Sequence, residues 1–137
     1  MYSPQLVIAT LLAASAALTG AVSIQPRQSS LACNAARLQI IKALSDTKKS
    51  VADIQDPTVQ QAAAAGVKQA QQGVTQVAAS LLTGQAPSAD GRNTVEAGLN
   101  ATATALAGGD SADPAVATTQ TALDDAVTAG QNVVANC

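Results

Sequence analysis

Hydrophobic and polar residues alternate along most of this chain with the period of an α-helix. From residue 28 onward, apolar side chains recur every three or four positions, and no stretch alternates with the two-residue period of a strand. The pattern predicts four helices, over residues 30–55, 57–83, 90–107 and 114–136. The sequence therefore indicates an all-α fold.

Residues with capping roles mark the predicted helix boundaries. Asp56 and Asp113 each precede a proline, and an Asp-Pro pair favours the start of a helix because proline tolerates its first position and the carboxylate accepts hydrogen bonds from exposed N–H groups. Gly84 follows the second segment, where a helix commonly ends. Four helices joined by short loops predict an up-down-up-down four-helix bundle.

Each segment has an apolar stripe that we expect to face the core. In the first segment, the stripe comprises Leu31, Ala35, Leu38, Ile41, Leu44, Val51 and Ile54. In the second, it comprises Val59, Ala63, Gly66 or Val67, Ala70, Val74, Val77 and Leu81. In the fourth, it comprises Val116, Leu123, Val127, Gly130 and Val134. The third segment has only Val95, Leu99 and Leu106, so we expect its helix to be the most weakly held.

Two stretches of the chain resemble each other. The segments that begin at Asp56 and Asp113 share the Asp-Pro pair and the residue pairs Val59/Val116, Gly73/Gly130 and Val77/Val134. Either duplication of a helical hairpin or chance similarity accounts for the match, and both interpretations stay open.

The amino-terminal region has the pattern of a signal peptide. The apolar run "LVIATLLAASAAL" over residues 6–18 is too short to cross a bilayer, and small residues suited to signal peptidase follow it. We therefore predict a signal peptide over residues 1–23, further processing as far as residue 27, and a mature domain over 28–137. Residues 22 and 24 are alternative mature starts. The protein is expected to be secreted, to the medium or the cell wall, without a transmembrane segment.

The two cysteines support an even number of helices. In an oxidising compartment, Cys33 and Cys137 are expected to pair, an intermolecular bridge being the alternative. Cys33 lies in the first predicted helix and Cys137 at the end of the fourth. Because neighbouring helices alternate in direction, these two positions meet at one end of a four-helix bundle. The predicted domain is thus linked end to end by one disulfide.

The composition of the chain argues against most kinds of enzyme and against a nucleic-acid-binding protein. The chain has no His, Trp or Phe, and its single Tyr, Tyr2, belongs to the predicted signal peptide. Without an imidazole base or a free thiol, we expect neither enzymatic activity nor a metal or other cofactor. A net charge of −2 and the lack of aromatic rings in the mature domain also argue against a nucleic-acid partner.

One modification motif remains. Asn100, Ala101 and Thr102 form an N-glycosylation sequon, which a secreted eukaryotic chain can use. Because Leu99 and Leu106 define the core side of the third helix, we expect Asn100 to lie away from the core.

The overall plan of the chain resembles a known family. A signal peptide, a "PR" processing point and an Ala-, Thr- and Gln-rich helical domain with "LQIIKALSDTKKSVADI" are similar to small secreted proteins of filamentous fungi. They most nearly resemble the hydrophobic surface-binding protein A and cell-wall galactomannoprotein family. The resemblance implies a non-enzymatic helical protein that adsorbs to apolar surfaces or holds a lipid between its helices.

Two functional hypotheses follow from the sequence. The first is a monomeric protein that binds hydrophobic surfaces or lipids at or near the fungal cell wall. If the third helix moves, an acyl chain would contact Ile41, Leu44, Val74, Val95, Leu99, Leu106 and Leu123. The alternative is a secreted effector or elicitor that acts on a host or in the cell wall.

Overall fold

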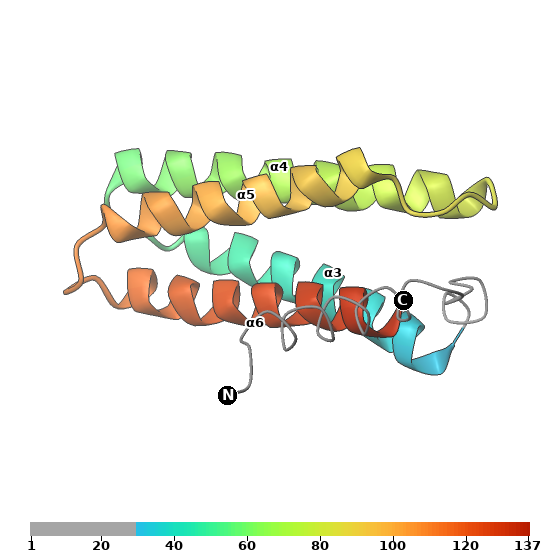
Figure 1. Cartoon of the computed structure of the whole chain (residues 1–137). Coiled ribbons are helices and arrows are strands. Elements are labelled where there is room, and N and C mark those ends of the chain that lie inside the picture. The colour runs from blue at the N-terminus through green and yellow to red at the C-terminus, as the bar shows by residue number, and fades with distance from the viewer. Residues whose placement is uncertain (1–29) are drawn as a thin grey trace, which may run out of the picture.

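The computed structural model describes residues 30–137, so the signal peptide predicted over 1–23 and the processing predicted as far as 27 lie outside the described residues. Four helices form the domain: α3 (Leu31–Val51), α4 (Pro57–Leu82), α5 (Ala89–Ala107) and α6 (Pro114–Asn136). They alternate in direction, and residues 30–137 contain no strand (Figure 1). The predicted all-α, up-down-up-down four-helix bundle is confirmed.

The predicted caps form where the sequence placed them. Asp56 accepts hydrogen bonds from the backbone N–H groups of Thr58 and Val59 at the start of α4, and Asp113 accepts one from Ala115 at the start of α6. Gly84 ends α4 with a φ of 73°, a left-handed conformation that glycine adopts without the steric cost of a Cβ atom. Local side-chain chemistry therefore sets these three boundaries.

Helix α3 ends at Val51, before the predicted limit near residue 55. A tight turn follows, in which the N–H of Ala52 donates to the carbonyl of Lys49 and that of Ile54 donates to Val51. Ile54 is nevertheless buried. The turn continues the apolar stripe into the core without continuing the helix, so periodicity alone could not locate the helix end.

The four helices are organised as two close pairs. Helix α4 packs mainly against α5, and α3 packs mainly against α6, while contacts of α3 with α4 and of α5 with α6 are fewer. Figure 1 shows α4 and α5 lying side by side, with α3 running away from them toward α6 at the end that carries the C-terminus. The two similar segments that begin at Asp56 and Asp113 form α4 and α6, and each of these helices packs mainly against a helix of the other hairpin.

The α4·α5 pair is held together by backbone contact. A Cβ atom added to Gly98 would lie 2.6 Å from the carbonyl oxygen of Gly66 and 2.8 Å from the Cα of Ala70. A Cβ on Gly73 would lie 2.6 Å from the carbonyl oxygen of Gly91. Small residues thus let the two helices approach closely, as they do wherever a helix interface lacks large side chains.

The core contains aliphatic side chains, alanines and three threonines. Thr47, Thr102 and Thr119 are fully buried, and each hydroxyl donates to the carbonyl four residues earlier, at 2.7 to 2.9 Å. Since the hydroxyls are satisfied inside their own helices, threonine can pack here almost as valine would. Buried threonines such as Thr102 therefore add to the packing of α5, whose apolar stripe in sequence is short.

Candidate functional site

The outer face of α3 carries large hydrophobic side chains in solvent. Leu31, Leu38 and Ile41 are 89%, 68% and 52% exposed, respectively. At 3.6 residues per turn, Leu31 and Leu38 lie almost in line along the helix, and Ile41 lies on the neighbouring part of the same side. We call this set, together with Lys42, Lys48 and Lys49, the outer face of α3.

The predicted core stripe of α3 was therefore wrong for Leu31, Ala35, Leu38 and Ile41, and that of α6 was wrong for Val127 and Val134, which are also exposed. Helix α3 instead buries a different side, which comprises Cys33, Ala36, Ile40, Ala43, Leu44, Thr47 and Val51. Cys33 must face α6 in order to reach Cys137, and this requirement sets the rotation of the helix. Had the predicted disulfide been used to orient the helical pattern, the sequence would have indicated the buried side.

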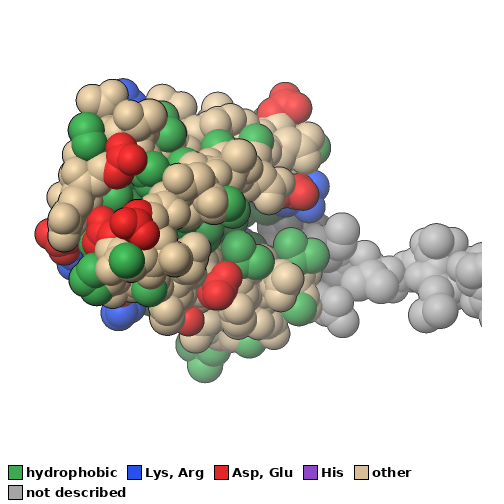
Figure 2. All heavy atoms as spheres, turned by 90° about the vertical axis from the view of Figure 1, so that its left-hand side faces the viewer, with side chains coloured by type: hydrophobic (Ala, Val, Ile, Leu, Met, Phe, Trp, Pro, Cys, Tyr) green, Lys and Arg blue, Asp and Glu red, His purple; other side chains and the backbone are tan. Residues whose placement is uncertain are grey.

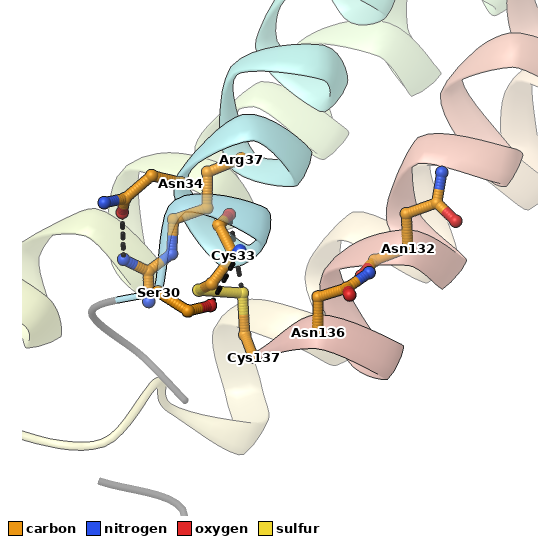
Figure 3. The surroundings of a disulfide bond; sticks show 7 residues. All are labelled: Ser30, Cys33, Asn34, Arg37, Asn132, Asn136 and Cys137. Atoms are coloured by element: carbon orange, nitrogen blue, oxygen red, sulfur yellow. Dashed lines mark hydrogen bonds between the residues drawn. A yellow bond between two sulfur atoms is a disulfide. The ribbon is translucent and has the colours of Figure 1, made fainter. Parts of the chain in front are cut away.

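The disulfide lies at the end of the bundle opposite the α3–α4 and α5–α6 turns. Cys33 and Cys137 are bonded, with their Cα atoms 4.9 Å apart, which confirms the intramolecular pairing. Figure 3 shows Ser30 beside this bond, where its hydroxyl oxygen accepts from the N–H of Cys33. The side chain of Arg37 lies above the same region and donates to Asn34. The amino-terminal half of the outer face of α3 thus lies on the part of the helix that the disulfide joins to the end of α6.

Charge is distributed unevenly over the fold. Helix α3 has four of the chain's seven basic residues and one of its nine acidic residues. The acidic residues collect elsewhere, four of them in the two turns that join α3 to α4 and α5 to α6. Figure 2 looks onto this end of the molecule and shows Asp and Glu side chains gathered there. The protein is acidic overall, but α3 is basic.

Lysines of the outer face differ in how much of their charge is compensated. The Nζ of Lys42 lies 2.6 Å from Asp46, and that of Lys49 lies 3.7 Å from the same carboxylate. The hydrogen bond from Lys42 lowers the pKa of Asp46, and it raises the pKa of Lys42. Lys48 is exposed and forms no ion pair with any residue in the described part of the chain. The positive charge of Lys48 is therefore the most accessible of the three.

The residues predicted to line a lipid site are mostly core residues. Leu44, Leu99, Leu106 and Leu123 are buried in the main apolar cluster, and Val74 and Val95 are half-buried against it. Ile41 is separated from the other six on the outer face of α3. The structure thus brings six of the seven predicted residues together, as parts of a packed core.

Shallow grooves lie on the described part of the chain, and two of them are lined by none of those seven residues. One, of about 270 Å³, lies between α3 and α6 and is lined by Gln39, Lys42, Ala43, Asp46, Ala122, Asp125, Thr128, Ala129 and Asn132. The other, of about 290 Å³, lies at the turn end beside Asp56, Asp110 and Asp113. Most of the residues that line these two grooves are polar or charged, unlike those of the mostly apolar pockets that hold small hydrophobic ligands.

We also searched the described helices for a metal site, a membrane span and an accessible glycosylation sequon. Within residues 30–137, no group of three or more His, Cys, Asp or Glu side chains is arranged to hold a metal ion. Over the same residues, no helix combines the length and hydropathy of a membrane span. Asn100 is exposed on α5, whereas the sequon's Thr102 is completely buried.

Comparisons with known proteins add no relative. The chain matches no protein-family model, and no curated protein or solved structure is significantly similar to it. The family resemblance seen in the sequence pattern stays a prediction.

Proposed function

We propose that this protein is a non-enzymatic, secreted binding protein that adsorbs to hydrophobic surfaces or lipids at or near the fungal cell wall. The observation that carries the proposal is the exposure of Leu31, Leu38 and Ile41 on one face of α3. Isolated exposed hydrophobic residues are common on proteins, but three on one side of one helix form an apolar strip that can contact a partner. The strip lies on a helix anchored at that end by a disulfide, so adsorption need not unfold it.

The secretory part of the proposal is supported by the sequence and the disulfide together. A disulfide that joins the two ends of a domain is typical of proteins that fold in an oxidising compartment. The signal-peptide pattern of residues 1–23 points to the same compartment. Attachment to the cell wall rests on the family resemblance alone.

The packing of the interior supports binding through the outer face rather than between helices. Helices α4 and α5 touch through Gly66, Gly98 and Ala70 so closely that an acyl chain cannot enter between them without separating the pair. Leu99, Leu106 and Leu123 already fill the space where the helix pairs meet. An outer hydrophobic strip needs no such rearrangement.

Adsorption to a hydrophobic polymer tests the proposal. The double variant Leu38→Ser, Ile41→Ser should lose most of its adsorption, because it removes most of the exposed apolar strip. Val134→Ser is the matched control, since Val134 is 74% exposed but lies on α6. Equal adsorption of the wild-type protein and both variants would mean that the outer face of α3 does not contact the polymer.

The alternative function is distinguished by the same protein preparation. If the protein adsorbs neither to the polymer nor to lipid vesicles, yet provokes a response in host tissue, the surface-binding proposal fails. The effector or elicitor hypothesis would then take its place.

A further inference from the structure

The charges of α3 indicate which kind of surface its outer face fits. The exposed apolar residues Leu31, Leu38 and Ile41 occupy the amino-terminal half, and Lys42 and Lys49 follow along the same side. At 3.6 residues per turn, Lys49 lies in line with Leu31 and Leu38. A hydrophobic segment and a basic segment are therefore presented together on one exposed surface.

A second copy of the chain is a poor occupant for this surface. Two such faces would bring their lysines together, and like charges in contact oppose association. The three exposed apolar side chains also offer far less area than the roughly 800 Å² that each partner contributes to a stable protein interface. The face is too small and too basic to be a dimer interface.

An anionic lipid surface satisfies both halves of the face. Basic helices with an apolar side lie along a bilayer, with the apolar residues among the acyl chains and the lysines among the headgroups. Helix α3 has four basic residues and one acidic residue, whereas the rest of the described chain is acidic, so an anionic bilayer would attract α3 more strongly than the other helices. The charge asymmetry thus favours α3 as the element that meets the surface.

We propose that the outer face of α3 docks onto anionic lipid headgroups, with Leu31, Leu38 and Ile41 inserted at the surface and Lys48 and Lys49 on the headgroups. Lys42 contributes less, because its ammonium is already bonded to Asp46. This inference rests on the proposed function and specifies its partner, a bilayer surface that carries negative charge.

Cosedimentation with lipid vesicles tests the inference on the full secreted protein. Binding should be stronger to mixed phosphatidylcholine and phosphatidylglycerol vesicles than to vesicles of phosphatidylcholine alone. The double variant Lys48→Gln, Lys49→Gln should lower the partition coefficient by about fivefold per lysine. Lys68→Gln, which removes an exposed lysine of α4, is the matched control and should leave it unchanged.

The apolar half of the face is tested in the same assay. Leu38→Ser should lower binding to the mixed vesicles by about tenfold, since the leucine would be buried at the surface. Val134→Ser should have no effect. Raising the salt from about 0.1 M to 1 M shortens the Debye length from about 10 Å to 3 Å and should release the wild-type protein.

Three results would overturn the inference. Equal binding to charged and neutral vesicles would remove the anionic partner. If Leu38→Ser and the double variant Lys48→Gln, Lys49→Gln bound the mixed vesicles as the wild-type protein does, the outer face of α3 would not be the lipid-binding surface. A dimer that dissociates on Leu38→Ser, seen by sedimentation velocity, would make the face an interface between copies. If adsorption to the hydrophobic polymer persists in any of these cases, the proposed function survives; if it is lost as well, both fail.

Discussion

The carboxylate of Asp113 joins the two turns at one end of the bundle, because it accepts a hydrogen bond from the backbone N–H of Gln55. The N–H of Gln55 lies 3.0 Å from one carboxylate oxygen, and the N–H of Ala115 lies 2.9 Å from the other. One side chain therefore caps α6 and ties the α3–α4 turn to the α5–α6 connection.

Replacing Asp113 by alanine should destabilise the fold more than replacing the equivalent cap, Asp56. Loss of an Asp N-cap costs about 1 kcal/mol, and loss of the bond from Gln55 adds about 1 kcal/mol. Asp56→Ala removes a cap with no link to the other turn. Urea denaturation of both variants measures the difference, and equal losses would mean that the bond to Gln55 adds nothing.

Gly98→Ala should destabilise the protein by about 1–3 kcal/mol, the usual cost of overpacking. The new Cβ would meet backbone atoms of Gly66 and Ala70, so α4 and α5 would have to separate. Gly130→Ala is the control, because its Cβ would lie 3.6 Å from the Cδ1 atom of Ile40, an ordinary contact. Alanine favours helix over glycine by about 1 kcal/mol, so this control should be neutral or stabilising. Thermal unfolding of both variants decides the point.

Removing the disulfide should lower the melting temperature. The bond closes a loop of about 100 residues, for which chain entropy predicts at most about 4.7 kcal/mol of stabilisation. We expect Cys33→Ser, Cys137→Ser to unfold at lower temperature and to remain helical in the cold. The wild-type protein should show no reactive thiol before reduction; a titre near two thiols per chain would contradict the bond.

The ion pair of Lys42 and Asp46 predicts opposite effects at acid and alkaline pH. The hydrogen bond from Lys42 lowers the pKa of Asp46, so the stability it contributes is present above the unfolded-state pKa and is lost as the pH falls through the folded-state pKa. The same bond raises the pKa of Lys42, whose contribution is lost as the pH rises through its folded-state value.

Titration by NMR checks these two shifts. In the variant Lys42→Met, the carboxyl carbon of Asp46 should titrate at a higher pH than in the wild-type protein. Because both side chains are well exposed, the pair should contribute little to overall stability. An unchanged Asp46 titration would show that the pair does not form in solution.

The buried sequon threonine predicts that Asn100 can be glycosylated only before α5 has packed. The hydroxyl of Thr102 is inaccessible and donates to the carbonyl of Gly98 at 2.9 Å. Secretion from a eukaryotic host should give a glycosylated chain, and Asn100→Gln should abolish the added mass. An oligosaccharyltransferase should modify the unfolded chain but not the folded, unglycosylated one; equal modification of both would contradict the expectation.

The sequence by itself determined where three of the helix boundaries lie and which cysteines pair. Asp56 and Asp113 with their prolines, and Gly84, act on backbone groups within a few residues, so their effect could be read locally. The pairing of Cys33 with Cys137 was expected because these are the only two cysteines of a chain with a signal-peptide pattern, and it agrees with an even number of helices of alternating direction. These features depend on local hydrogen bonds and on an even number of helices of alternating direction. Neither requires knowledge of how the helices pack.

The tertiary structure alone decided which helices pair closely, and it exposed a side of α3 that hydrophobic periodicity had assigned to the core. Helix α3 has two apolar sides of helical period, and its packing against α6 and α4, with Cys33 bonded to Cys137, buries the one with Ile40 and Leu44 and exposes the one with Leu31 and Leu38. The α4·α5 contact likewise depends on glycines that carry no hydrophobic signal in sequence, because their effect is to let two backbones approach. The candidate site on the outer face of α3 exists because that choice left three large hydrophobic residues in solvent.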